Sequence, residues 1–311
     1  MIKKTLYFGN PAYLSLSNRQ LVIKLPEVEK NPDFPESFKK AATTTIPIED
    51  IGVVILDHRQ ITITQALIAA LLDNTVALIT CNDKRMPTGM LLPLQGNNTQ
   101  SERFRSQIEA SLPLKKQLWQ QTVRAKIENQ ATLLERQTGR EAKNLRRMAA
   151  EVKSGDSDKC EAKAAAYYWK NIFPSLPFFV RGQEESPPNN LLNYGYAILR
   201  AVVARALVAS GLLPVYGIFH HNKYNDYCLA DDIMEPYRPF VDQMVADMVV
   251  SGENIEDLTI DLKRKLLQIP VIDVKMGDKR SPLMIAVAQT TASLAKCFNG
   301  ECRRISYPDF V

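Results

Sequence analysis

The chain has 311 residues, of which 45% are hydrophobic and 23% charged, and its net charge is +5. This composition is typical of a globular protein and excludes a collagen-like or disordered chain. No apolar run reaches the ~20 residues that a membrane helix needs, and the length favours two domains, each able to bury its own core.

The first 85 residues are predicted to form a β-rich domain. Alternating apolar residues favour two strands over 13–17 and 20–25, joined by a tight turn at Asn18-Arg19. Short β-branched runs at 52–56 and 75–80 have the pattern of buried strands. The stretch 64–72, rich in alanine and leucine, predicts a short helix between them.

Two segments of this region lack periodicity. Residues 25–45 contain three prolines and several charges, so we expect an excursion from the sheet. Residues 86–100 contain Pro87, Gly89, Pro93 and Gly96. These prolines and glycines interrupt helices and strands, and they predict a linker before a second domain over 101–311.

The second domain begins with a basic region. Residues 101–153 hold six glutamates and twelve cations, which are Arg103, Arg105, Lys115, Lys116, Arg124, Lys126, Arg136, Arg140, Lys143, Arg146, Arg147 and Lys153. The region therefore carries +6 and the rest of the chain −1. A polyanion-binding surface and an ordinary solvated helix face are both compatible with this charge.

Helical periodicity continues to the end of the chain. Helices are predicted over 189–210, with Gly211 as C-terminal cap, and over 231–250 and 282–298. The expected fold class is therefore α+β, with a small β-rich N-terminal domain followed by a larger all-α domain.

Three segments carry residues suited to chemistry. His220 and His221 follow Gly217, and Asp232 and Glu235 share a face three residues apart on a predicted helical turn. A loop imidazole brought to these acids would make a mixed nitrogen and oxygen site that suits Mn²⁺ or Mg²⁺. By spacing alone, surface acids that cap a helix beside an unrelated histidine explain the pattern better than a metal site does.

The third segment is the alanine-rich stretch 159–170, in which Glu161 stands near a helix start. The helix macrodipole is by itself a sufficient explanation for an acid at that position. The five cysteines are scattered, without a C-x-x-C pair, so neither a disulfide framework nor a structural zinc site is expected. No secretion signal is visible, and we expect a cytoplasmic protein.

Together these segments resemble a known family. Four segments are similar to the CRISPR-associated integrase, the first-numbered Cas protein of spacer acquisition. They are the helix opening on Glu161, the run Asn193-Tyr194-Gly195-Tyr196-Ala197, the segment 217–220 and the run Met234-Glu235-Pro236-Tyr237-Arg238-Pro239. The order, the spacing and the β-then-α architecture agree over essentially the whole chain. The likeness is greatest to the branch that accompanies a single-protein effector nuclease (type II-like).

The resemblance implies a metal centre. The family's ligands fall on Glu161, His220 and Glu235. Asp232 matches a supporting acid, and Lys223 a basic residue near the phosphate. His221 has no clear counterpart, and we expect a structural or supporting role for it.

The resemblance also implies the reaction and the partners. A divalent ion, Mg²⁺ or Mn²⁺, would serve the attack of a 3′-hydroxyl of a short DNA duplex on a repeat phosphodiester. The expected partners are double-stranded DNA, a second copy of the chain joined through the N-terminal domain near 52–56, a small ferredoxin-like adaptation protein and an effector nuclease, with no membrane. Two alternatives are a non-catalytic DNA-binding scaffold and a metal-dependent DNA repair nuclease.

The resemblance gives the basic region a role in phosphate contact. Arg140, Lys143, Arg146 and Arg147 are the preferred candidates because they cluster shortly before Glu161. Arg238 is a competing case, since it could hold Glu235 as easily as it could contact DNA.

Overall fold

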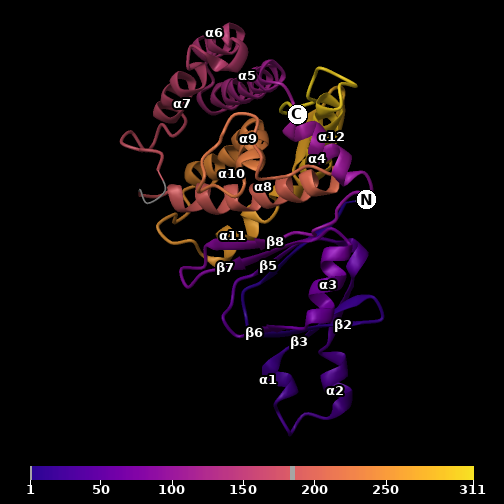
Figure 1. The fold of residues 1–311 in the computed structure, drawn as a ribbon. Helices are drawn as coiled ribbons and strands as arrows, with labels where there is room; N and C mark the ends of the chain where they lie inside the picture. The colour runs from indigo at the N-terminus through magenta and orange to yellow at the C-terminus, as the bar shows by residue number, and fades with distance from the viewer. Residues whose placement is uncertain (1, 183–185) are drawn as a thin grey trace. The chain divides into compact units, whose positions relative to one another are not determined.

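The computed structural model describes residues 2–182 and 186–311, and the chain forms two compact units, 1–96 and 97–311 (Figure 1). The first unit contains two sheets. One has the order β1-β5-β7-β8, and the other has the order β4-β3-β2-β6. The strands are β1 (Lys4–Phe8), β2 (Ala12–Ser17), β3 (Gln20–Lys24), β4 (Thr44–Pro47), β5 (Ile51–Leu56), β6 (Ile61–Ile63), β7 (Ala77–Cys81) and β8 (Pro87–Leu91).

The core of the first unit lies between its sheets and α3 (Gln65–Asp73). Leu14 of β2, Val54 of β5 and Leu67 of α3 belong to one buried cluster. The strand β5 pairs in parallel with both β1 and β7, and it is central in its sheet. This central position explains why 52–56 is apolar on both faces, so the hydrophobicity of that strand does not argue for a dimer contact.

The predicted hairpin over 13–25 is confirmed by antiparallel pairing of β2 with β3. Asn18 and Arg19 form its turn with φ of 49° and 58°, the left-handed pair that matches the twist of a hairpin. The predicted helix over 64–72 is confirmed by α3. Part of the segment 86–100, which the sequence predicts as a linker, instead forms β8, the edge strand beside β7.

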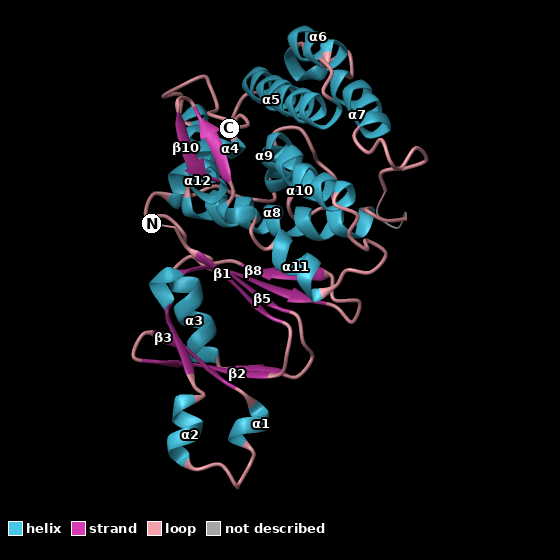
Figure 2. Cartoon of the chain, turned by 180° about the vertical axis from the view of Figure 1, so that it is seen from behind, coloured by secondary structure: helices cyan, strands magenta, loops and turns pink. Residues whose placement is uncertain are grey.

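The excursion after residue 25 forms two short helices, α1 (Pro26–Glu29) and α2 (Glu36–Ala41), before the chain returns to the sheet in β4. Neither helix contains a buried residue. Figure 2 shows both helices beyond β2 and β3, away from α3.

The second unit is built mainly of helices. They are α4 (Gln100–Ile108), α5 (Leu112–Thr138), α6 (Lys143–Glu151), α7 (Cys160–Asn171), α8 (Asn189–Ala209), α9 (Cys228–Met234), α10 (Arg238–Val250), α11 (Ile260–Leu266) and α12 (Leu283–Phe298). A 3-10 turn, η3 (Glu235–Tyr237), joins α9 to α10.

Two predictions for this unit are wrong in detail. It is not all-α, because β9 (Asp273–Met276) and β10 (Lys279–Pro282) form an antiparallel hairpin turning at Gly277-Asp278. The helix predicted over 231–250 is interrupted by η3, because Pro236 and Pro239 cannot donate the backbone hydrogen bonds of a continuous helix.

Helix α5 runs through the second unit. Ser111 caps its start, where the Ser111 hydroxyl accepts from the Leu114 amide, and Gly139 ends it in the left-handed conformation. Side chains from many turns of α5 are buried, polar ones included, such as Lys126 and Asn129. The helix contacts α7, α9, η3 and α10, and so connects the segments that carry the candidate site residues.

Helix α8 is long and apolar enough to cross a membrane by length and composition, but 72% of that stretch is buried inside the protein. It contacts α9, α10, α11 and α12. Gly195 allows the close approach of α10, since a Cβ atom there would lie 2.5 Å from Val241 Cγ1. These contacts make α8 a core helix of the second unit.

Candidate functional site

The site is organised around a buried lysine. Lys126 of α5 is 8% exposed. Its Nζ lies 2.7 Å from Oε1 of Glu161 and 2.5 Å from Oε2 of Glu235. Two of the acids that the sequence singles out therefore lie on either side of one cation, although 74 positions separate them in the chain.

Glu161 lies in the first turn of α7. Asp156 caps this helix, because its carboxylate oxygens accept from the backbone amides of Cys160 and Glu161 at 2.8 and 3.1 Å. The residue before the helix, Lys159, has a φ of 55°, which turns the chain into α7. This geometry fixes the helix start, and the Glu161 side chain extends from it to Lys126.

Glu235 is buried at the start of η3. Asn129 of α5 fixes this turn, since its Nδ2 donates to the carbonyl of Pro236 at 2.8 Å. Arg238 Nε donates to Oε1 of Glu235 at 2.8 Å, and the Arg238 guanidinium lies 4.5 Å from the centre of the Tyr196 ring. Arg238 thus holds Glu235, one of the two roles expected for it.

The charges of this cluster favour the ionised forms. Burial by itself would raise the pKa of Glu235, but Arg238 and Lys126 outweigh burial and lower it well below its usual range. Burial would lower the pKa of Lys126, yet Glu235 and Glu161 raise it. The cluster therefore consists of two carboxylates and an ammonium in a poorly solvated place.

His220 is held by Asp232. The Nδ1 atom of His220 lies 2.5 Å from Oδ1 of Asp232, whose side chain is fully buried. The other oxygen of Asp232 accepts from the backbone amides of Ile218 and Phe219 at 2.7 and 2.9 Å. One carboxylate therefore fixes both the loop and the ring, and its bond to Nδ1 leaves Nε2 of the histidine for another partner.

The hydrogen bond from Asp232 raises the pKa of His220, although partial burial opposes this shift. The charges of Glu235 and Glu161 raise it further, so these three side chains share one electrostatic environment. The ring also packs edge-on against Trp119, whose centre is 5.5 Å away.

Gly217 explains the glycine of the segment 217–220. A Cβ atom at this position would lie 2.4 Å from the carbonyl oxygen of His220 and 2.8 Å from Oδ2 of Asp232. Only glycine allows the backbone to come so close to the residues that it positions.

The residues present fit a divalent cation. The cation Lys126 Nζ is already shared by the two glutamates, and the buried Oε2 of Glu235 accepts no aligned hydrogen bond. Together with the imidazole of His220, these carboxylates make the mixture of oxygen and nitrogen donors that Mn²⁺ or Mg²⁺ accepts. Among the described residues, no three acidic, imidazole or thiol side chains already converge as a metal site.

Other predicted site residues lie apart from this cluster. Lys223 is exposed, and its Nζ packs over the ring of Tyr224 at 4.7 Å. His221 is exposed as well. No disulfide joins any of the five cysteines, all of which lie in the described part of the chain.

The candidate DNA contacts fall into two groups. Arg140, Lys143 and Arg147 are exposed at or near α6. Arg146 instead pairs with Glu128 at 2.6 Å and Glu135 at 2.7 Å, and so ties α6 to α5. The first group remains suited to phosphate contact, whereas Arg146 is engaged within the protein.

Next to Glu235 and Lys126 lies a cavity of about 270 Å³. Its walls are formed by Lys126, Gln130, Trp169, Arg181, Gly182, Tyr196, Glu235, Arg238 and Asp242. Lys126, Gln130 and Asp242 are not predicted as site residues from the sequence. Lys126 stands in the basic run, where nothing in the pattern separates a buried cation from solvated ones.

Asp242 gives a pH prediction. Its carboxylate accepts from the hydroxyls of Tyr168 and Tyr196, but burial outweighs these bonds and the nearby Arg238, and raises its pKa to about 6. Because this exceeds the ordinary value of about 3.9, the folded state holds the proton more tightly than the unfolded state. The free energy of unfolding therefore falls as the pH rises from about 4 to 6. The difference corresponds to about 3 kcal/mol.

We expect Asp242→Asn to remove this loss of stability. Between pH 4 and pH 7, the free energy of unfolding of the variant should rise relative to that of wild type by roughly 2–3 kcal/mol. Urea unfolding at several pH values measures it. Both tryptophans, Trp119 and Trp169, lie in the second unit, so their fluorescence follows that unit alone. Identical pH dependence for the two proteins would contradict the assignment.

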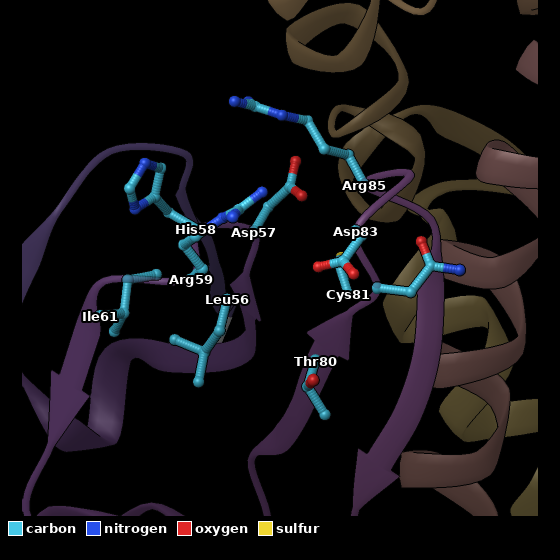
Figure 3. A pocket seen from close by; sticks show the side chains of 10 residues that line it. Leu56, Asp57, His58, Arg59, Ile61, Thr80, Cys81, Asp83 and Arg85 are labelled. Atoms are coloured by element: carbon cyan, nitrogen blue, oxygen red, sulfur yellow. The ribbon is translucent and has the colours of Figure 1, made fainter.

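A separate pocket of about 290 Å³ lies in the first unit, at the carboxyl ends of the parallel strands β5 and β7. Figure 3 shows Asp57, His58 and Arg59 on one side and Asp83 and Arg85 on the other. The hydroxyl of Tyr7 donates to Asp57 at 2.5 Å. Cations and acids are mixed in this pocket, so its charge does not favour one class of ligand.

Solved structures share this fold. A casposase bound to integration product matches with a TM-score of 0.73 and 19% identity over 98% of this chain and 93% of that chain. A Cas1 protein from Thermotoga maritima matches with a TM-score of 0.72 and 15% identity over 96% and 98% of the two chains. The β-rich unit and the helical unit thus form the fold of Cas1 proteins and casposases.

The sequence comparison specifies the family. The model described as CRISPR associated protein Cas1 matches residues 6–268. The CRISPR-associated endonuclease Cas1 of Neisseria meningitidis serogroup C (strain 8013) is 38% identical, over 100% of this chain and 97% of its own length. The chain belongs to the Cas1 family of CRISPR-associated proteins.

Proposed function

We propose that this protein is a divalent-metal-dependent DNA integrase, which inserts short duplex spacers into a repeat array by attack of a 3′-hydroxyl on a repeat phosphodiester. The observation that carries the proposal is the cluster around Lys126, where Glu161 and Glu235 share one cation and where the charges of both glutamates act on His220. A casposase of the same fold is described as bound to an integration product, which supports a strand-transfer reaction for this fold.

Glu161, Glu235 and His220 would hold the metal. When bound, a divalent ion would neutralise charge on the phosphate and favour ionisation of the attacking hydroxyl. The chain's own residues prepare these donors. Asp232 orients the imidazole. Arg238 binds Oε1 of Glu235, so Oε2, which Lys126 contacts, is the oxygen left for a metal. The burial of Glu235 limits solvation of the reacting groups.

Lys223 would contribute a cation close to the DNA phosphate from an exposed loop position, to which DNA has access. Exposed cations near α6 would bind the DNA backbone. Because phosphate contacts do not distinguish bases, we assign this surface to binding rather than to repeat recognition.

The DNA surface gives a prediction. The triple variant Arg140→Ala, Lys143→Ala and Arg147→Ala is expected to reduce the slope of log K against log salt by about 2–3, since each phosphate contact contributes about 0.9. Fluorescence anisotropy with a short duplex at several salt concentrations measures it. The matched control is Arg146→Ala, which removes an internally paired cation of the same helix and leaves the slope unchanged. An unchanged slope in the triple variant would place the DNA elsewhere.

Partners and location complete the proposal. Complexes described as Cas6-RT-Cas1–Cas2 contain a chain of this fold, with a TM-score of 0.74 over 98% of this chain and 36% of that one. Their composition supports a small adaptation protein, expected to be ferredoxin-like, as partner. We further propose a homodimer joined through the N-terminal unit, association with an effector nuclease, and a cytoplasmic location where chromosomal repeats are accessible.

The test is strand transfer of a short duplex into a supercoiled plasmid that carries a repeat, with the partner protein and Mn²⁺. We expect joined product with Mn²⁺ and none with EDTA. A duplex with 3′-dideoxy ends is the matched control, because it binds DNA-contacting residues but has no nucleophile. Nicking that persists with this control would favour the repair nuclease, and DNA binding without any cleavage or joining would favour the scaffold.

A further inference from the structure

Lys126 occupies the place where the proposed metal would bind. Its ammonium contacts Glu161 Oε1 and Glu235 Oε2, one oxygen from each expected carboxylate ligand. With the lysine removed, two carboxylates would remain near each other in a site where Glu235 is 6% exposed. Glu161 would then lose its cation and Glu235 would keep only Arg238, so Lys126 stabilises the protein when no metal is present.

The ammonium and a divalent ion exclude each other at these two oxygens. A metal that takes Glu161 Oε1 and Glu235 Oε2 as ligands needs the lone pairs that Lys126 now contacts. Two cations within bonding distance of the same oxygens would also repel each other. Metal binding therefore requires Lys126 to move.

The structure has a place for the displaced ammonium. The cavity of about 270 Å³ next to Glu235 is lined by Lys126 itself and by Gln130, one turn further along α5. Gln130 is 3% exposed, and its buried Oε1 accepts no hydrogen bond from the described residues. A buried acceptor without a donor is uncommon in folded proteins. A lysine ammonium has three donors to offer it.

We propose that Lys126 is an internal cation that pairs with Glu161 and Glu235 in the metal-free protein and moves into the adjoining cavity, toward Gln130, when a divalent metal binds. This inference rests on the proposed metal centre and adds a residue that governs metal affinity. Lys126 then acts through the carboxylates that it releases, as a positioning residue.

The first test is Mn²⁺ affinity, measured by calorimetry on the full-length protein without DNA. Lys126→Met keeps an unbranched side chain, one atom shorter, and removes the charge, so Mn²⁺ no longer displaces a cation. We expect about ten-fold tighter binding or more. Arg146→Met is the matched control, because Arg146 also pairs with two glutamates but lies outside the site, and its Mn²⁺ affinity should equal that of wild type.

A second variant separates displacement from the effect of a nearby charge. Gln130→Met leaves every charge in place and removes the acceptor for the displaced ammonium. We expect Mn²⁺ binding to weaken about three-fold or more, while the melting temperature in EDTA stays at the wild-type value. A lysine that never moves predicts no change in this variant.

Thermal unfolding, followed by tryptophan fluorescence, is the second readout. In EDTA, Lys126→Met should melt several degrees below wild type, because Glu161 loses its cation and the buried Glu235 keeps only Arg238. With excess Mn²⁺, the difference in melting temperature between Lys126→Met and wild type should disappear or change sign.

Mn²⁺ affinity of Lys126→Met that equals wild type or is weaker would overturn the proposal, because the lysine would then organise the carboxylates instead of competing for them. An unchanged affinity in Gln130→Met would overturn the movement into the cavity. Failure of the proposed function is a different result, since wild type would then show no metal-dependent joining. A protein that joins DNA normally while Lys126→Met binds Mn²⁺ like wild type contradicts only this inference.

Discussion

His220→Ala is expected to lower strand transfer by about three orders of magnitude, the factor that corresponds to several kcal/mol of lost transition-state stabilisation. The reason is that His220 is the imidazole proposed as metal ligand, that its ring is fixed by Asp232, and that the charges of both glutamates act on it. The measurement is the rate of joined product in the plasmid assay at saturating Mn²⁺ and DNA.

His221→Ala is the matched control for this variant. It removes the same side chain one position later, where it is exposed, and should retain the wild-type rate. Duplex affinity and melting temperature of His220→Ala should stay near those of wild type, since its side chain is 42% exposed. Equal rates for His220→Ala and wild type would remove the histidine from the proposed centre.

Asp232→Ala is expected to cause the second largest loss, of about 10- to 100-fold, which is typical for a residue that orients a metal ligand. Its carboxylate accepts from Ile218 and Phe219 amides as well as binding His220 Nδ1, so the substitution releases the loop along with the ring. The same change leaves buried amides without a partner and should lower stability by about 1–3 kcal/mol for each.

Asp232→Asn separates the two roles. The amide oxygen can still accept from the backbone, while the lost charge no longer raises the pKa of His220. We therefore expect near-wild-type stability with a reduced rate, and an acid limb of the pH–rate profile that shifts to lower pH, because a less basic imidazole loses its proton at lower pH. An unchanged profile in Asp232→Asn would show that Asp232 acts only on the backbone of the loop.

The sequence was sufficient for elements with strong local signals. The hairpin of β2 and β3 follows from alternation on both sides of Asn18-Arg19, and α3 follows from an apolar run of helical composition. The hairpin of β9 and β10 was missed, although Gly277-Asp278 between Val274 and Arg280 is a turn signal. Its strands are only four residues each, too short for a periodic pattern.

For the candidate site, the sequence suggests which residues could be metal ligands, but it does not predict how they are arranged in space. Glu161, His220 and Glu235 stand in three separate segments, and resemblance to a family linked them. Lys126 could not be found in this way, because burial depends on the packing of α5 against α7 and η3 rather than on local charge. The same packing separates Arg146, paired within the protein, from its exposed neighbour Arg147.

Asn129 donates not only to Pro236 next to Glu235 but also to the carbonyl of Pro308, 179 positions away in sequence, at 2.9 Å. Thr122, two turns earlier on α5, bonds the hydroxyl of Tyr307 at 2.8 Å. Residues 307–308 lie beyond the segment 6–268 that matches the family model. Substitutions at residues 307–308 are thus linked, through α5, to the position of Glu235. Residues 307–308 and the facing residues of α5 should therefore covary among relatives. Chimaeras that exchange only residues 6–268 should lose activity.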